Sequence, residues 1–492
     1  VIISPDEAKE LKEGAEILVQ DLKDMFGWDY RVVTGKKEKG AVCLALGKPD
    51  KTLGEEGYRM DVRSEVTIEA PTSKGVFWGT RTLLQMIHNQ PEGLMKGRAT
   101  DFPLYPNRGF MIDVARKFFT MDFLRDYAKI LSFYKLNELQ VHLNDNGFVQ
   151  FFGNDWNKTY AAFRLESERF PGLTAKDGSY TKEEFRDFQL MAARYGINVI
   201  PEIDVPAHSL SFTHYNPRLA ADKKEYGMDH LDLYKQEVYD FVDTLFDEYL
   251  SGENPVFVGP EVHIGTDEYN KKEAEQYRYF TDRYLKFVEK YGKNVRMWGG
   301  LKWLPGKTPV KAEGVTVNAW SYDWVDPVVS LQDGYKLINT CDTYLYIVPA
   351  AGYYRDFLDH QWIYEKWSPW IMNRKQTLPE GTPGVLGGMF AVWNDKCGNG
   401  ISEQDVHLRS FPAMQVLAEK LWKGENKNVT YEAFAKLCKT TPEAPGINLL
   451  GKVPAETALT EAGKELSFNG KEAVSTPLQE VGYPYSVEFQ LC

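Results

Sequence analysis

The sequence contains few cysteines and no long apolar run, and these absences exclude several classes of protein. Its five cysteines are widely spread, odd in number and form no Cys-x-x-Cys pair, so we expect neither a disulfide framework nor a cysteine zinc site. No stretch approaches the roughly 20 apolar residues that a membrane-spanning helix needs. The sequence therefore predicts no membrane-spanning segment.

The chain also lacks a basic surplus and the common cofactor motifs. Its formal net charge of -12 argues against nucleic acid as a partner, because nucleic-acid binders concentrate Lys and Arg in one field. It contains no His-Glu-x-x-His, no P-loop and no Gly-x-Gly-x-x-Gly after a predicted strand. The segment "NDNG" at 144–147 is similar to the start of a calcium loop, but the later ligands are missing. We therefore predict no metal and no cofactor.

Hydrophobic residues are abundant, and their spacing near the start of the chain predicts a small first domain. They make up 43% of the 492 residues, enough to bury large cores in two or three domains. Residues 1–102 predict a small α/β domain, and a proline-rich joint at 101–109 follows it. Within this domain the apolar spacing predicts helices over 6–25 and 75–87 and strands over 41–47, 57–63 and 66–71.

Residues 103–424 show apolar runs that alternate with longer segments of helical period. This alternation is typical of repeated βα units, and eight of them predict a (β/α)8 TIM barrel. The predicted strands lie at 108–115, 138–144, 197–204, 261–268, 295–300, 315–320, 336–342 and 384–394.

The periodicity fades after the barrel. We predict that residues 425–492 form a short, irregular C-terminal extension. Its last segment, 482–492, alternates like a strand, so the extension is interpreted as the start or edge of a β-rich module.

Two acids, Asp267 and Glu268, stand side by side where the fourth apolar run ends. Active sites of TIM barrels lie at the carboxyl ends of the strands, so both side chains are expected at the mouth. Neighbours this close cannot easily flank a sugar ring from opposite sides, as most glycosidase mechanisms require. They suit a mechanism in which the substrate's own 2-acetamido oxygen is the nucleophile and one acid protonates the leaving group. That acid needs a pKa near the working pH, which burial and neighbouring carboxylates can supply.

Four motifs of the predicted barrel resemble those of one enzyme family. "HIGTDE" at 263–268 resembles the His-x-Gly-x-Asp-Glu signature of glycoside hydrolase family 20, the β-N-acetylhexosaminidases. "RGFMIDVAR" (108–116), "VHLNDNG" (141–147) and "PEIDVPAH" (201–208) are similar to its first, second and third strand motifs. The small first domain also resembles the α/β domain of these enzymes. The resemblance implies a glycosidase whose substrate is an oligosaccharide or glycoconjugate carrying a 2-acetamido sugar.

By position, the resemblance implies roles for particular side chains. Asp267 would hold the acetamide N–H and stabilise the developing positive charge, and Glu268 would be the acid and then the base. Asp145 and His208 would form a relay with Glu268, and Tyr344 would donate its hydroxyl to the acetamide oxygen. The residues implied to bind the sugar are Arg108, Gln140 and His142, with Trp298, Trp320 and Trp393 as a box around the acetamide methyl.

Two departures from the family pattern bear on the substrate. Tyr346 stands where exo-acting members have an Asp, and Asp395 stands where they have a Glu. Both positions grip hydroxyls of a terminal sugar in those members, so the changes leave room for a substituted sugar. In this respect the sequence resembles the lacto-N-biosidase subgroup, which releases the disaccharide Gal-β1,3-GlcNAc from the non-reducing ends of oligosaccharides.

Other interpretations stay open at this point. One alternative is an exo-β-N-acetylhexosaminidase that releases single GlcNAc, GalNAc or 6-sulfated GlcNAc. A second is a barrel that binds glycans without cutting them, although Asp267 and Glu268 argue against it, because a binder gains nothing from a positioned acid. The substrate class implies an extracellular or cell-surface bacterial location. The sequence does not predict the oligomeric state.

Overall fold

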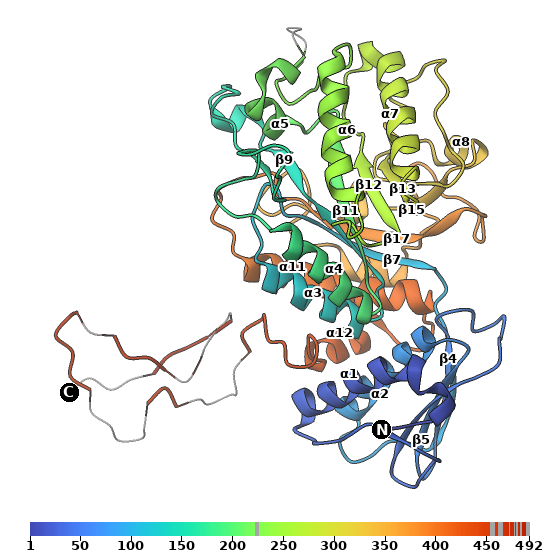
Figure 1. Ribbon diagram of the computed structural model, residues 1–492. Coiled ribbons are helices and arrows are strands. Elements are labelled where there is room, and N and C mark those ends of the chain that lie inside the picture. Colours follow the sequence, from blue (N-terminus) through green and yellow to red (C-terminus); the bar gives the residue numbers. More distant parts are fainter. Residues whose placement is uncertain are drawn as a thin grey trace.

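The computed structural model describes residues 1–221 and 226–452, and within the remainder residues 458–460, 466–471, 473–476, 478, 481–482 and 485–488. Figure 1 shows two bodies in sequence order, an amino-terminal sheet with its helices and a larger barrel. The boundaries after residues 102 and 424 stay a prediction.

The first body is a six-stranded mixed sheet with two helices packed on it. The strand order is β2-β1-β3-β5-β4-β6, in which β4 runs antiparallel to β5 and β6. The predicted helices and strands all form, while three further strands were missed because two are very short and β6 is polar and exposed. The elements are β1 (Ile2–Ile3), α1 (Ala8–Phe26), β2 (Val33–Thr34), β3 (Val42–Leu46), β4 (Tyr58–Val62), β5 (Val66–Ala70), α2 (Ser73–Asn89) and β6 (Gly97–Asp101).

The second body is a closed barrel of eight parallel strands, which confirms the predicted fold class. β15 and β7 both pair with β17, so the sheet closes on itself. Helices cover the outside of the strands and side chains fill the inside, which explains why the strands read as near-continuous apolar runs. The barrel strands are β7 (Asn107–Asp113), β8 (Glu138–His142), β11 (Asn198–Val205), β12 (Glu261–Gly265), β13 (Asn294–Trp298), β14 (Val315–Ala319), β15 (Lys336–Asn339) and β17 (Val385–Val392).

Polar caps fix where the outer helices begin. Thr120 accepts a hydrogen bond from Phe123 N, and Ser402 forms a capping box with Asp405 at the start of the long α11. Among the described residues, no helix combines the length and the apolar character that crossing a membrane requires. The helices are α3 (Met121–Phe133), α4 (Lys182–Arg194), α5 (Leu210–Tyr215), α6 (Gln236–Leu250), α7 (Ala274–Glu289), α8 (Pro327–Gln332), α9 (Asp342–Leu345), α10 (His360–Glu365), α11 (Glu403–Lys423) and α12 (Tyr431–Thr440).

Helix α12 corrects the prediction that residues after 425 are irregular. Thr430 caps it by accepting from Ala433 N, and only Phe434 of its side chains is buried, so its apolar signal in the sequence is weak. After α12 the described residues contain no helix and no strand beyond isolated bridges. The strand predicted over 482–492 is absent from the described part, residues 482 and 485–488, and otherwise lies outside the described residues.

Short elements extend the carboxyl ends of two barrel strands. β9 (Asn144–Asn146) follows β8 and pairs antiparallel with β10 (Ala161–Phe163). β16 (Tyr346–Ile347) adds to β17 beyond the end of β15. These extensions build up the wall of the mouth on the face that carries the predicted site.

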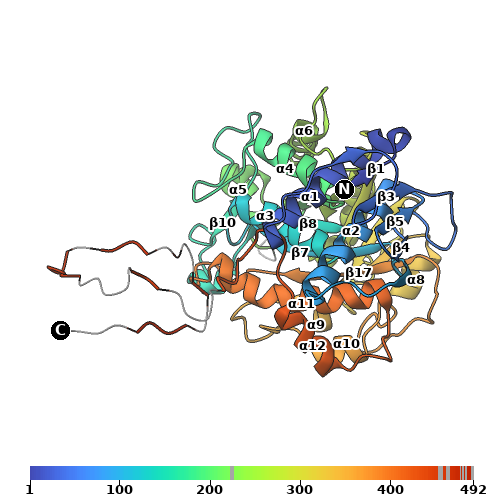
Figure 2. The same ribbon diagram turned by 90° about the horizontal axis from the view of Figure 1, so that it is seen from below.

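The amino-terminal sheet covers the opposite end of the barrel, where the strands begin (Figures 1 and 2). Arg108, at the start of β7, is completely buried there and donates to the carbonyl oxygens of Tyr105 and Lys135 at 2.8 Å. It also forms an ion pair with Glu56 from the first domain. The prediction that Arg108 binds sugar is therefore wrong, because the strand separates it from the mouth.

The Glu56–Arg108 ion pair gives a prediction about stability. Burial raises the pKa of Glu56, but Arg108 and Lys74 outweigh this effect and hold the pKa below its usual value. Glu56→Gln leaves Arg108 as an uncompensated buried charge and should lower the free energy of unfolding by about 3 kcal/mol. Urea unfolding of the unmodified protein, of Glu56→Gln and of a control variant measures this free energy. The partly exposed Asp61→Asn control, which loses only solvent-screened ion pairs with Arg63 and Arg98, should change it by less than about 1 kcal/mol, and an equal loss in both would contradict the interface role.

Candidate active site

The acid pair lies on a tight turn directly after β12. Gly265, Thr266 and Glu268 have φ angles of 69°, 77° and 50°, in the left-handed region that strains ordinary residues. Gly265 is required here, because a Cβ would stand 1.8 Å from Asp204 Oδ1 on the neighbouring strand. Thr266 N donates to the same oxygen at 3.1 Å. The turn breaks the strand alternation and presents both Asp267 and Glu268 to the mouth.

His208 connects Asp145 to both acids. Its Nδ1 lies 2.9 Å from Asp145 Oδ1, and its Nε2 lies 3.3 Å from Glu268 Oε2 and 3.7 Å from Asp267 Oδ2. Asp145 comes from β9 and His208 from the residues after β11, where its φ of 52° is again left-handed. The structure thus brings together four of the residues predicted from the sequence.

The pKa values of His208 and Glu268 place the proton of this relay differently from the prediction made for the acid. Burial lowers the pKa of His208, but the carboxylates of Asp145, Asp267 and Asp204 outweigh it and hold this pKa well above its usual value. Burial raises the pKa of Glu268, but His208 and Arg116 outweigh it and hold this pKa below its usual value. The ligand-free site therefore stores its proton on His208, not on Glu268. The prediction that burial and neighbouring carboxylates raise the pKa of the acid is wrong for the free protein, because the positive charges of His208 and Arg116 outweigh both effects.

Asp267 shares a proton with Asp204. Burial raises the pKa of Asp267 to about 6, with Glu268 adding to the shift while His208 opposes it. Burial and Asp267 together raise the pKa of Asp204 well above its usual value. Asp204 Oδ2 and Asp267 Oδ1 are both buried and receive no other donor, so one proton between them satisfies both oxygens. Asp204 is thereby the neutral partner that leaves Asp267 free to ionise.

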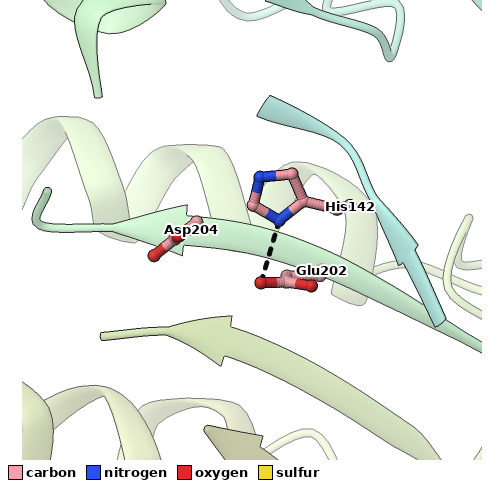
Figure 3. Close-up of side chains that lie close together, drawn as sticks. All are labelled: His142, Glu202 and Asp204. Atoms are coloured by element: carbon pink, nitrogen blue, oxygen red, sulfur yellow. Dashed lines mark ion pairs between the residues drawn. The ribbon is translucent and has the colours of Figure 1, made fainter. Parts of the chain in front are cut away.

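A buried polar layer supports the site from below. His142 Nε2 lies 2.7 Å from Asp145 Oδ2, and its Nδ1 lies 3.0 Å from Glu202 Oε1 (Figure 3). Gln140 Nε2 donates to Glu202 at 2.7 Å, and Trp298 Nε1 donates to Glu202 at 2.6 Å. His142, Gln140 and Trp298 have no exposed surface, so they position other groups. The prediction that these residues contact the sugar is corrected accordingly.

Two groups of side chains have the composition and spacing of a metal site. The ligand atoms of His142, Glu202 and Asp204, and those of Asp204, His208 and Asp267, lie within 4.8 Å of one another in each group. Several of these side chains also have ionic partners within the protein: His142 Nδ1 lies 3.0 Å from Glu202 Oε1, and His208 Nε2 lies 3.7 Å from Asp267 Oδ2.

Aromatic side chains follow the ends of barrel strands and form an apolar wall at the mouth. Trp320, Tyr346 and Trp393 keep small exposed fractions of 7%, 5% and 8%. The ring of Trp393 lies 5.6 Å from Trp298 and 5.8 Å from Tyr346, measured between centroids. Trp320 Nε1 donates to Gly299 O at 2.9 Å, which fixes that indole. The wall is therefore apolar and rigid.

The structure and the sequence differ on which tyrosine lies near the acids. The ring of Tyr344 stacks on Trp362 at 4.4 Å, and the charges that influence it are those of Cys341, Arg374 and Arg355. Tyr346 is buried beside Trp393, and burial with the charges of Tyr354, Asp342 and Asp267 raises its pKa well above the usual value. Tyr346, not Tyr344, is therefore the tyrosine that faces the acids. Its proton stays in place over the whole working range of pH.

Arg116 also belongs to the site, although it was not predicted from the sequence. Its Nη1 lies 2.8 Å from Asp145, 3.2 Å from Asp113 and 3.6 Å from Asp395. Asp395 also accepts from the Tyr353 hydroxyl at 2.8 Å. Arg116 ends the same motif that begins with Arg108. Because active sites of TIM barrels lie at the carboxyl ends of the strands, the sequence already favoured Arg116 over Arg108.

Comparisons with known proteins agree with this geometry. The sequence matches the family model described as glycosyl hydrolase family 20, catalytic domain, over residues 105–277 and 271–425. It matches the model described as glycosyl hydrolase family 20, domain 2, over residues 1–102. A solved GH20 beta-N-acetylhexosaminidase from Streptomyces coelicolor A3(2) superposes with a TM-score of 0.72 at 23% identity, covering 89% of this chain and 90% of that one. At this identity the likeness supports the fold.

Curated relatives are distant in sequence and longer than this chain. A beta-hexosaminidase of Porphyromonas gingivalis is 27% identical over 369 residues, which cover 64% of this chain and 44% of that protein. A lacto-N-biosidase of Bifidobacterium bifidum is 24% identical over 446 residues, which cover 85% of this chain and 37% of that protein. The chain thus spans less than two thirds of the length of either.

The shared proton of the carboxyl pair can be measured directly. The Asp204–Asp267 pair should take up one proton with an apparent pKa of about 6, visible in carbon NMR of protein labelled at the Asp carboxyl carbons. Asp267→Asn should remove this step, and the Asp61→Asn control on β4, far from the acid pair in the first domain, should keep it. Carboxyl signals that stay constant from about pH 5 to 7 would contradict this titration of the pair.

Proposed function

The chain belongs to glycosyl hydrolase family 20, and we propose that it hydrolyses β-glycosides of 2-acetamido sugars with the substrate's own acetamide as nucleophile. The observation that carries this proposal is the adjacency of Asp267 and Glu268 on one strained turn, with His208 3.3 Å from Glu268 and 3.7 Å from Asp267. Adjacent acids cannot act from opposite faces of the sugar, but they can act on the acetamide and on the leaving oxygen.

In the first step the acetamide oxygen attacks C1 as the bond from C1 to the leaving oxygen breaks. Asp267 accepts the acetamide N–H and, as a carboxylate, stabilises the positive oxazolinium that forms. Tyr346 donates its hydroxyl to the acetamide, since its raised pKa keeps the proton in place. The wall formed by Trp320 and Trp393 holds the acetamide methyl, so the attacking oxygen is aligned in advance.

Glu268 gives its proton to the leaving oxygen, and His208 supplies that proton. The Glu268 side chain is 45% exposed in the free protein, so a bound glycan removes water from it. Loss of water favours the neutral carboxylic acid and draws the proton from His208 Nε2. In the second step water attacks C1 as the bond from C1 to the acetamide oxygen breaks, Glu268 accepts a proton from that water, and the β-configuration is restored.

Release of a disaccharide is the second candidate function, and Asp395 favours it. Asp395 is shorter than the Glu of exo-acting members and lies at the mouth between Arg116 and Tyr353. The match to a lacto-N-biosidase over 85% of this chain supports the same interpretation. We keep both candidates, release of a single acetamido sugar and release of Gal-β1,3-GlcNAc. Substrates of either kind lie outside cells, so an extracellular or cell-surface location is part of the proposal.

Two substitutions test the mechanism. Glu268→Gln removes the proton donor and should lower kcat on an aryl β-GlcNAc glycoside at least about 10³-fold. Asp267→Asn removes the charge that stabilises the oxazolinium and should lower kcat about 10²- to 10³-fold. Glu289→Gln, an exposed position on α7, is the matched control. Normal turnover by either active-site variant would refute the proposed role of that acid.

A side-by-side assay decides between the two released units. We expect p-nitrophenyl β-lacto-N-bioside to be cleaved if the space beside Asp395 admits a second ring. Tyr353→Phe should then change the ratio of kcat/KM for the disaccharide and monosaccharide glycosides by about fivefold, because it removes one hydrogen bond to Asp395. Cleavage of p-nitrophenyl β-GlcNAc alone would establish release of a single sugar.

A further inference from the structure

Basic side chains gather on one side of the barrel mouth. Lys271 follows β12, Lys302 follows β13, and Lys375 precedes β17. In the part of the chain that the structure describes, none of the three ammonium groups lies within 4.0 Å of a carboxylate oxygen. This differs from Arg116 in the same mouth, which meets three carboxylates.

Aromatic rings hold these ammonium groups in place. Lys302 Nζ lies 3.5 Å and Lys375 Nζ 4.1 Å from the centre of the Tyr322 ring, and Lys302 also donates to the Tyr322 carbonyl oxygen. Lys271 Nζ lies 4.6 Å from the Trp303 ring. Cation–π contacts stabilise each ammonium group, but two cations on one ring repel each other. An anion bound near both would relieve that repulsion.

A stack of indoles links the three lysines, called the basic rim below, to the apolar wall that contains Trp320. Trp320 lies 5.6 Å from Trp324 with 29° between the ring planes, and Trp324 lies 5.2 Å from Trp303 with 34° between them. Trp320 is a wall residue of the pocket, whereas Trp303 is 37% exposed. A glycan that leaves the pocket along this stack therefore reaches the lysines.

Local hydrogen bonds fix the loops that carry the rim. Lys302 N donates to Trp324 O at 3.2 Å, which ties the loop after β13 to the loop after β14. Asn373 Oδ1 accepts from Lys375 N at 2.8 Å, and Asn339 at the end of β15 donates to Ile371 O at 2.8 Å. The lysines thus project from braced backbone. Asp323, the exposed carboxylate next to Tyr322 in sequence, forms no ion pair with them in the described part of the chain.

We propose that Lys271, Lys302 and Lys375, with Trp303 and Tyr322, form a subsite for a carboxylate or sulfate group on the leaving-group sugar of the glycan. The proposal rests on the proposed function, because it takes Glu268 as the acid at the glycosidic oxygen. Lys271 lies three residues after Glu268, at the start of a short 3-10 helix in the same loop after β12, and the proposal places the sugar attached to that oxygen over this segment. The exposed part of the Trp303 indole suits an apolar contact with a pyranose ring, and the ammonium groups suit its acidic substituent.

A matched pair of substrates tests the subsite. GlcNAc β-linked to glucuronic acid and GlcNAc β-linked to glucose differ in one carboxylate. We expect kcat/KM of the unmodified protein to favour the acidic disaccharide by about tenfold at low ionic strength, and salt should reduce this preference. In the double variant Lys302→Gln and Lys375→Gln the ratio should fall toward one. Lys436→Gln, an exposed lysine on α12, should leave the ratio unchanged.

Other outcomes would overturn the proposal. A ratio near one in the unmodified protein, or a preference that survives in the double variant, would do so. A lysine-dependent preference for 6-sulfated over plain aryl GlcNAc glycosides, without one for the disaccharide pair, would refute the leaving-group placement.

Binding separates this proposal from the proposed function. Calorimetry of both disaccharides on Glu268→Gln compares affinities without turnover. If no glycoside is hydrolysed by the unmodified protein, tighter lysine-dependent binding of the acidic disaccharide supports the subsite and leaves the hydrolase function refuted. Equal binding of the two disaccharides refutes the subsite whatever the turnover.

Discussion

The site depends on how its buried carboxylates are neutralised. Asp145 is completely buried, and its charge is balanced by Arg116, His142 and His208, each within 3 Å. Burial raises its pKa, but these cations outweigh burial and hold it well below the usual value. Because Asp145 stays ionised, His208 stays protonated, and the proton for the proposed acid is stored next to Glu268. Removing any one partner would leave an uncompensated charge in the barrel interior.

Asp204 and Asp267 form a second carboxylate pair, which is neutralised by a proton. The pair exists because two neighbouring strands approach closely at Gly265, where any side chain would collide with Asp204. The left-handed turn that follows carries strain, and the packed barrel maintains it. The close approach of the two strands, the strained turn and the raised pKa of Asp267 thus occur together at one place in the barrel. That arrangement fits a group that must be a carboxylate beside a developing cation and buried away from water.

The first domain and the mouth lie at opposite ends of the barrel. The Glu56–Arg108 ion pair joins the amino-terminal sheet to the strand beginnings, so the carboxyl ends of the strands remain open to a ligand. The loops of that open end carry two kinds of surface. One is the apolar wall of Trp320, Tyr346 and Trp393, and the other is the basic rim that begins at Lys271. In the proposed function the first would select the acetamido sugar and the second its neighbour.

The sequence by itself determined the fold class, the family and the acid pair. Eight buried strands show as apolar runs because helices cover one face and the core fills the other, and the motif order preserved the positions of Asp145, His208, Asp267 and Glu268. It did not determine which of two arginines or two tyrosines faces the ligand. Arg108 and Arg116 lie eight residues apart in one motif, yet the strand carries them to opposite ends of the barrel. Charge states were also decided only by the tertiary structure, since the pKa of Glu268 depends on His208, which is distant in sequence and adjacent in space. Periodicity is a local property of the chain, whereas burial and charge neighbours are properties of the assembled barrel.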